Sequence, residues 1–289
     1  MRSEFANRAI TAREFAAAAR EIGAAGESTG AAQLLALLYD ERVEGAAILA
    51  CLRSEPTLAA RVLKVANSAY YRCAGTVGTL ERAIQILGTS AIRGIAAVGC
   101  MDRIAVPTVG KLFDSRRFRF HSLAVAAAAQ SLSRLAGSSV DSEAFMAGLL
   151  HDIGVVVLAR LRPEAAVMLS EMRDLNEDGI RSAEVSLFGV DQVSASVRVA
   201  SEWNLPSWLT SALNSQGATR VDRPYTGYEA LPALLALGHR CAQDAGFGLL
   251  VLSAGDPKRD WFVSLGLDSA ACSSVAEEIP QSLLRLGSI

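Results

Sequence analysis

The chain has few cysteines, and their spacing is not that of a disulfide-rich secreted protein. Its 289 residues include five cysteines, an odd number, and no two of them form a Cys-x-x-Cys pair. This usage argues against a disulfide framework or a zinc knuckle and favours free thiols in a reducing compartment. Glu4, Glu14 and Glu21 argue against a signal or transit peptide, and no apolar run approaches the ~20 residues of a membrane span. We therefore expect a cytoplasmic protein that does not enter a membrane.

An excess of one charge is also missing. The chain has 28 Lys and Arg residues against 30 Asp and Glu residues, a formal net charge of −2. Proteins that wrap nucleic acid or lie on anionic membranes carry a strongly basic face, and the most basic run here is the short Arg116-Arg117-Phe118-Arg119. A solvated helix face explains that run, with contact to a phosphate or an acidic partner as the alternative. We expect neither nucleic acid nor a membrane among the partners.

Signals for β-strands are lacking as well. There is no long alternation of apolar and polar residues, and no Asn-Gly or Asp-Gly turn joins two strand-like runs. Apolar residues, 51% of the chain, instead recur at helical spacing and suffice for a sizeable core. Ser54-Glu55-Pro56 has the composition of a helix cap. The sequence predicts an all-α fold, with helices near residues 11–22, 33–39, 56–67, 80–87, 92–101, 121–136, 141–152, 186–203, 231–242 and 273–286.

The dipeptide His151-Asp152 is the strongest chemical signal. It follows Phe145–Leu150, an apolar helical segment, and buried polar groups need partners or a metal. His121 lies 30 residues earlier, at the head of its own helical segment, and helical bundles build metal sites from several helices. Imidazole and carboxylate together suit Fe, Mn or Zn, and two such ions can clamp a phosphoester. The alternative is a structural pair, with an aspartate that accepts hydrogen bonds and a histidine in a polar pocket.

Other candidate residues have two interpretations each. His239 lies in Leu235–Arg240 and is either a structural histidine or a fourth metal ligand. Asn67, Tyr70 and Tyr71 end a predicted helix, where an asparagine can terminate it and the tyrosines can fill the core. The functional interpretation is that these three residues line a groove for a partner or a ligand.

Several blocks of the sequence together resemble one known family. The blocks, in chain order, are Glu55-Pro56, Asn67 to Tyr71, Ala83-Ile84 with Leu87-Gly88, His121-Ser122-Leu123, Glu143 to Gly154, Glu184 to Gly189, and Trp203 with Leu205-Pro206. In this order they resemble HDOD proteins, the non-enzymatic signalling relatives of the HD-GYP and HD phosphohydrolases, over about residues 31–246. The resemblance implies a helical subdomain at 31–120 packed on an HD-like bundle at 121–246. An N-terminal helix and linker, 1–30, would precede them, and a helical tail, 247–289, would follow.

The chain departs from the active members of this superfamily at the expected metal ligands. The histidine that follows the Phe-Gly segment in active relatives corresponds here to Gln192, and a His-His pair corresponds to Asn214-Ser215-Gln216. The late aspartate corresponds to His239, and Glu229 stands where a Gly-Tyr-Pro signature needs proline. The resemblance thus implies an incomplete two-metal centre. His121, His151, Asp152 and His239 remain, and they could hold a single divalent metal.

The expected function follows from this pattern. We expect a bacterial-type signalling regulator that contacts another signalling protein through helical surfaces and needs no cofactor, with the degenerate metal site kept as a structural polar cluster. The alternatives are a metal-dependent phosphohydrolase that acts on a nucleotide or cyclic dinucleotide, and a nucleotide-binding sensor. The sequence specifies neither the partner nor the oligomeric state.

Overall fold

Helices account for almost all of the structure, a computed structural model that describes residues 10–24, 31–40, 42–43, 45–68, 70–71, 76–104, 115–172, 176–215, 225, 227–249 and 259–285. No strand occurs within these ranges, which confirms the all-α prediction. The helices are α1 (Ala12–Gly23), α2 (Ala31–Leu38), α3 (Gly45–Arg53), α4 (Pro56–Ala66), α5 (Leu80–Arg103), α6 (Ser115–Leu135), α7 (Asp141–Leu150), α8 (Ile153–Leu161), α9 (Pro163–Glu171), α10 (Glu177–Phe188), α11 (Gln192–Glu202), α12 (Ser207–Asn214), the 3₁₀ turn η2 (Gly227–Ala230), α13 (Leu231–Asp244), α14 (Arg259–Leu265) and α15 (Ser269–Arg285).

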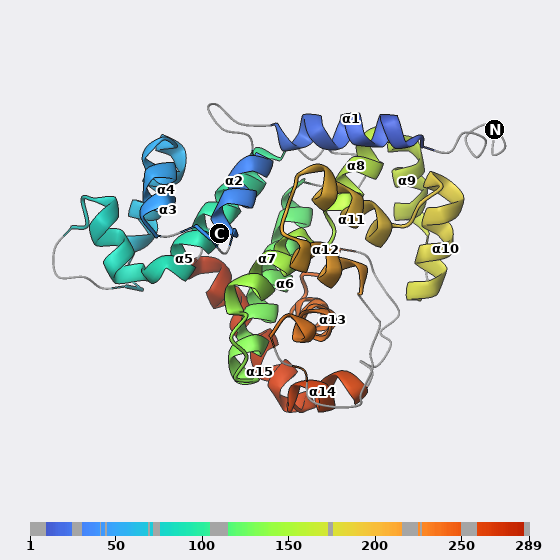
Figure 1. The fold of residues 1–289 in the computed structure, drawn as a ribbon. Helices are drawn as coiled ribbons and strands as arrows, with labels where there is room; N and C mark the ends of the chain where they lie inside the picture. The colour runs from blue at the N-terminus through green and yellow to red at the C-terminus, as the bar shows by residue number, and fades with distance from the viewer. Residues whose placement is uncertain are drawn as a thin grey trace.

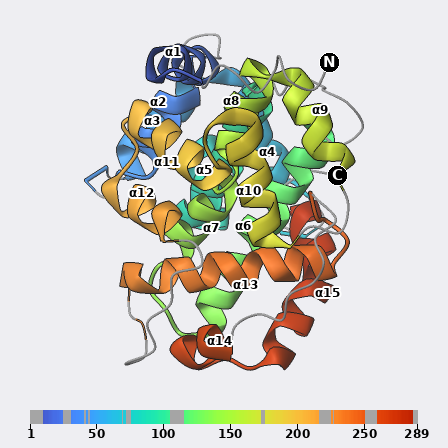
Figure 2. The ribbon, with the colours of Figure 1, turned by 90° about the vertical axis from the view of Figure 1, so that its right-hand side faces the viewer.

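Two groups of helices meet at the centre of the molecule (Figures 1 and 2). Helices α2 to α5 form one lobe, in which α5 packs on α2, α3 and α4. Helices α6 and α7 lie side by side at the core of the second group, and α13 packs on both of them. Helix α1 lies along the top of Figure 1 and contacts α2, α8 and α11, so it links the two groups. This arrangement matches the predicted subdomain packed on a helical bundle.

The predicted C-terminal tail is an integral part of the bundle. Val275, Ile279 and Leu283 follow one another at helical spacing on α15, and each is at least 98% buried. Helix α15 packs on α6 and α13. The sequence pattern therefore located this helix correctly. The helix belongs to the core of the bundle and does not extend from it as a tail.

The helix predicted over residues 186–203 is two helices. Gly189 adopts a left-handed conformation, φ 78°, and ends α10. The Asp191 side chain then accepts a hydrogen bond from the backbone N–H of Ser194 at 3.0 Å and begins α11. A left-handed glycine and a capping aspartate are ordinary signals for ending and restarting a helix, so the single predicted helix was wrong.

The prediction that Ser54-Glu55-Pro56 caps a helix is right in position, but no side chain makes the expected capping hydrogen bond. Pro56 does stand in the first turn of α4, but the Glu55 side chain makes no capping hydrogen bond. Its carboxylate is 99% buried and accepts a hydrogen bond from Arg103 Nη2 at 2.7 Å. Glu55 therefore joins α4 to the end of α5 as part of a buried ion pair.

Two stretches are long and apolar enough to cross a membrane by length and composition alone, although charged residues interrupt the apolar run in each of them. They are Leu80–Arg103 and Asp141–Leu161, with 50% and 89% of their apolar windows buried inside the protein. Each is interrupted, the first by Gly88 with φ 77° and the second by the turn at His151 and Asp152. In this fold both stretches pack on other helices.

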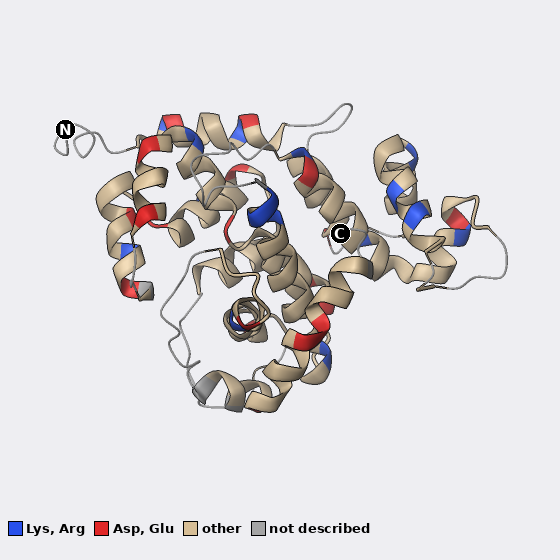
Figure 3. Ribbon diagram, turned by 180° about the vertical axis from the view of Figure 1, so that it is seen from behind, with Lys and Arg blue, Asp and Glu red and all other residues tan. Residues whose placement is uncertain are grey.

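Charged residues of both signs are interspersed along the helices. Figure 3 shows Lys and Arg next to Asp and Glu on several of them, and in this view neither sign covers a whole face. Ion pairs such as Arg61 with Asp102 and Arg240 with Asp244 join many of these groups. The distribution agrees with the near-neutral net charge.

Candidate functional site: a cluster of three histidines and an aspartate

All three histidines of the chain lie in one cluster. His121 is on α6, His151 ends α7, Asp152 precedes α8, and His239 is on α13. The Nε2 atoms of His121 and His151 are 3.2 Å apart, and Asp152 Oδ2 is 3.4 Å from the first and 3.2 Å from the second. The His239 ring centroid is 5.1 Å from that of His121 and 5.6 Å from that of His151. The predicted convergence of His121 with the dyad is therefore confirmed.

Small residues allow these helices to approach closely enough. A Cβ atom at Gly148 would lie 2.6 Å from the Ala126 Cα, so α6 and α7 can meet at this distance only because residue 148 is glycine. A Cβ atom at Gly238 would lie 3.0 Å from the Ala129 backbone nitrogen, which sets α13 equally close to α6. Gly148 precedes His151 by three residues and Gly238 precedes His239 by one. The close approach therefore delivers the rings to one point.

Backbone carbonyls fix the tautomers of two of the rings. His121 Nδ1 donates to the Phe247 carbonyl and His151 Nδ1 donates to the Gly148 carbonyl, both at 2.8 Å. A carbonyl only accepts, so each Nδ1 carries a proton. In neutral rings the two Nε2 lone pairs then point at each other and at the Asp152 carboxylate. Three acceptor atoms converge, so a proton, another hydrogen-bond donor or a metal cation is needed to offset their repulsion.

The pKa values follow from this crowding. Burial raises the pKa of Asp152, but the positive charge of His151 and hydrogen bonds from both rings hold that pKa well below 3.8. Burial lowers the pKa of His151, but the adjacent Asp152 carboxylate more than offsets this and raises it overall. Burial, together with repulsion from His121 and His151, lowers the pKa of His239 to about 3. Without a metal, His151 is thus the preferred place for a proton, and His239 stays neutral.

The donor atoms fit a single divalent metal. Tetrahedral coordination with bonds of about 2.0–2.2 Å places neighbouring ligand atoms roughly 3.3–3.6 Å apart. The observed separations among His121 Nε2, His151 Nε2 and Asp152 Oδ2 are close to this, at 3.2–3.4 Å. The ligand atoms of the three histidines lie within 4.8 Å of one another, so neutral His239 can supply a fourth. Asp152 Oδ1 is buried and has no hydrogen-bond partner among the described residues. Metal binding itself stays a prediction.

Glu184 is a site residue that the sequence analysis missed. It is 98% buried on α10, and its Oε2 accepts a hydrogen bond from the Gln192 backbone N–H at 2.9 Å. Burial, with repulsion from Asp152, raises the pKa of Glu184 to about 7. The sequence signal that could have identified Glu184 is its position at the start of the family block Glu184 to Gly189. The contact described for Gln192 is this backbone one, and the prediction that its side-chain amide faces the cluster stays a prediction.

The other positions at which active relatives carry metal ligands or the Gly-Tyr-Pro signature have structural roles here. Asn214 ends α12, and the backbone N–H of Ser215 donates to the helix; Gln216 lies outside the described residues. In the Gly-Tyr segment, the Tyr228 ring stacks on Trp208, with centroids 5.7 Å apart and planes inclined by 4°. Because every histidine of the chain is in the one cluster, no imidazole remains for a second metal.

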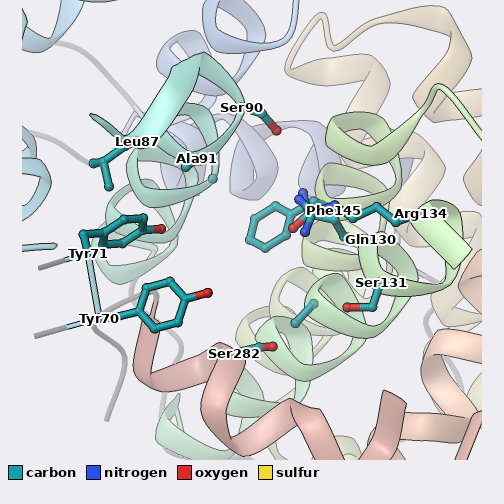
Figure 4. A pocket seen from close by; sticks show the side chains of 12 residues that line it. Tyr70, Tyr71, Leu87, Ser90, Ala91, Gln130, Ser131, Arg134, Phe145 and Ser282 are labelled. Atoms are coloured by element: carbon teal, nitrogen blue, oxygen red, sulfur yellow. The ribbon is translucent and has the colours of Figure 1, made fainter. Parts of the chain in front are cut away.

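The three residues expected to line a groove divide into two roles. Tyr70 and Tyr71 line a cavity of about 270 Å³ that is bordered by α5, α6, α7 and α15 (Figure 4). The Asn67 amide instead donates to the Leu63 and Val77 carbonyls, at 2.8 and 2.9 Å, and accepts from the Val77 N–H at 2.8 Å. Asn67 thus holds the end of α4 to the segment before α5.

Comparisons with known proteins agree with this architecture. The HDOD domain family matches residues 28–218, whereas no curated protein matches the chain. A candidate phosphohydrolase from Shewanella amazonensis SB2B is 25% identical, with a TM-score of 0.65 over 95% of this chain and 96% of its own. An HDOD domain protein of unknown function from Geobacter sulfurreducens is 21% identical, with a TM-score of 0.67 over 96% and 97%. A candidate signal transduction protein from Marinobacter aquaeolei VT8 is 22% identical, with a TM-score of 0.62 over 94% and 64%.

Proposed function

We propose that this chain, which belongs to the HDOD family, is a non-enzymatic signalling regulator that acts through protein–protein contacts. The observation that carries the proposal is the use of all three histidines in one cluster that suits one ion. Two-metal hydrolysis of a phosphodiester needs a second ion about 3.5–4 Å from the first. Gln192, Asn214 and Ser215 offer an amide or a hydroxyl where that ion needs an imidazole, and these groups are poor ligands for a transition metal.

In this proposal the cluster holds the bundle together. His121, His151, Asp152 and His239 come from α6, the α7–α8 junction and α13, so a shared cation or proton fastens these helices at one point. The carbonyl partners of His121 and His151 orient the rings before anything binds. A metal bound there would contribute to folding stability, because the separated ligands of the unfolded chain bind it far more weakly.

A metal-dependent phosphohydrolase is the second candidate, and two observations favour it. Asp152 Oδ1 is buried without a partner among the described residues, as expected of an atom that could contact a second ion. Glu184, with a pKa of about 7, could accept or donate a proton near neutral pH. The resemblance to the Shewanella candidate phosphohydrolase, which covers 95% of this chain, adds weight to this reading.

Metal analysis and a hydrolysis assay separate the two candidates. The chain would be purified without chelators, its metal content measured, and the protein incubated with Mn²⁺ and a chromogenic phosphodiester or a cyclic dinucleotide. A regulator should retain at most one metal equivalent and release no product. Turnover that requires Mn²⁺ and disappears in both His151→Ala and Asp152→Ala, but persists in Arg20→Glu at the surface, would establish the enzyme instead. Thermal stabilisation by a nucleotide without turnover would indicate a sensor.

A further inference from the structure

A second concave site lies away from the histidine cluster, between helices that are far apart in the sequence. The cavity of about 270 Å³ is bounded by Tyr70 and Tyr71 after α4, by α5, by the C-terminal half of α6, and by Ser282 on α15 (Figure 4). Gln130 lines it nine residues after His121 on the same helix, which is about 13 Å along the helix axis. The two sites therefore occupy different ends of α6.

The walls of this groove differ in chemistry. The rings of Tyr70 and Tyr71 meet edge to face, with centroids 4.9 Å apart, on one side of the cavity, and Phe145, 98% buried, lies across from them. Polar groups come from Ser90, Gln130, Ser131, Arg134 and Ser282. An apolar wall beside a row of hydrogen-bonding groups suits a ligand with an apolar side chain on a polar backbone.

The charge of the groove has one sign. Arg134 is the one charged residue in the lining of this cavity. Its Nε donates to Asp141 Oδ2 at 3.0 Å, whereas its two terminal nitrogens have no partner within the described part of the chain. The side chain is 59% exposed. A guanidinium with free donors beside a cavity favours a carboxylate on the ligand.

Exposed apolar residues form a rim beside the groove. Tyr70, which lines the cavity, is 55% exposed, and Leu135, which is one residue beyond Arg134 and one helical turn beyond Ser131 on α6, is 57% exposed. A ligand small enough to fit the cavity alone would leave this rim in water. A pocket inside an apolar rim is instead typical of a protein-binding surface, where one anchor side chain fills the pocket and its neighbours cover the rim.

We propose that this groove binds a segment of a partner protein that places one large aromatic or aliphatic side chain against Tyr71 and Phe145 and an Asp or Glu side chain on Arg134. The inference rests on the proposed regulatory function and deepens it, because it states where the partner docks and what chemistry the partner segment carries. The Ser131 and Ser282 hydroxyls would bond the backbone of that segment, because Ser90 Oγ already contacts Ser142 Oγ and Gln130 Nε2 already donates to the Asp141 carbonyl.

Peptide selection on the intact protein tests the proposal. A random peptide library would be selected on the full chain and counter-selected on a Tyr70→Ala, Arg134→Glu double variant whose circular dichroism matches the parent. We expect recovered peptides to share an acidic residue near a large apolar one. Binding measured by fluorescence anisotropy should weaken at least tenfold in Arg134→Glu and in Tyr70→Ala. Arg20→Glu is the matched control, because Arg20 is 64% exposed and also paired with a carboxylate, and it should bind like the parent.

The decisive experiment exchanges the charges of Arg134 and of the acidic residue in the peptide. A peptide with Lys in place of its acidic residue should bind Arg134→Glu better than it binds the parent; if Arg134→Glu is unstable, Arg134→Gln should still weaken the acidic peptide. Peptides that bind all variants equally, or a failure to enrich any peptide, would overturn the groove as a docking site. A dimer in light scattering that Tyr70→Ala dissociates would assign the groove to a second copy and also overturn it. A signalling partner whose binding ignores these variants would leave the proposed function standing while the groove proposal fails.

Discussion

The histidine cluster and the groove are built on the same two helices, α6 and α7, yet they have opposite surroundings. The cluster lies at the end of α7, where glycine and alanine bring backbones together and His121, His151 and Asp152 are at least 96% buried. The groove lies beside the C-terminal end of α6, where Arg134 and Leu135 are exposed to water. Under the proposed function, the buried cluster stabilises the packing of the helices, whereas the exposed groove is the surface that meets a partner.

Loss of the aspartate should have the largest effect on stability. Asp152→Ala leaves His121 and His151 buried without their anionic neighbour, and breaking a buried charged pair costs roughly 3–5 kcal/mol. We expect a loss of about 4 kcal/mol in the free energy of unfolding, measured by urea denaturation, together with loss of any bound metal. Asp152→Asn should lose less, since the amide oxygen still accepts a hydrogen bond. A stable Asp152→Ala protein would mean that the cluster is not structural.

The buried carboxyl group of Glu184 should give the next largest effect, as a dependence of stability on pH. Its folded pKa is about 7 and its ordinary value is 4.5, so the folded state binds the proton more tightly. Stability from this group is complete below about pH 4.5 and falls as the pH rises to about 7, by up to roughly 3 kcal/mol. Glu184→Gln should remove that decline. The difference in the free energy of unfolding between parent and variant isolates the contribution of Glu184, because the titration of His151 is common to both. If the two curves of stability against pH are parallel, the raised pKa of Glu184 is contradicted.

Packing at Gly148 should follow. Gly148→Ala places a methyl group 2.6 Å from the Ala126 Cα, and backbone atoms cannot move aside as a flexible side chain can. Overpacking of this kind costs about 2 kcal/mol, and we expect the variant to weaken the cluster as well, because His151 follows three residues later. Gly45→Ala is the matched control: its nearest neighbour would be 3.6 Å away, an ordinary contact, and its stability should not fall.

Substitutions at the rim of the groove should have the smallest effect on stability. Leu135→Ala removes a side chain that is 57% exposed, so we expect a change within about 0.5 kcal/mol in urea denaturation. The same variant should weaken peptides selected on the groove, because rim contacts exclude water from the anchor. A large loss of stability in Leu135→Ala would show that the rim supports the fold, and the contrast between the two sites would then disappear.

Local sequence patterns accounted for most helices because the forces that start and stop a helix act over a few residues. Pro56 lies in the first turn of α4 as predicted, and Gly88 leaves the helical conformation in the gap between the helices predicted at 80–87 and 92–101. The error over residues 186–203 came from reading apolar spacing across Gly189, where local backbone geometry overrides periodicity.

Composition and helical spacing determined the fold class, the resemblance of several ordered sequence blocks indicated the family, and the His-Asp dipeptide together with His121 supplied three residues of the cluster. Only the tertiary structure decided that His239 joins them, that Glu184 is buried beside Asp152, and that Asn67 supports a loop while Tyr70 lines a groove. These facts arise from contacts between helices far apart in the chain. Such contacts depend on how closely two backbones approach, as at Gly148 and Gly238, and no local pattern encodes that distance.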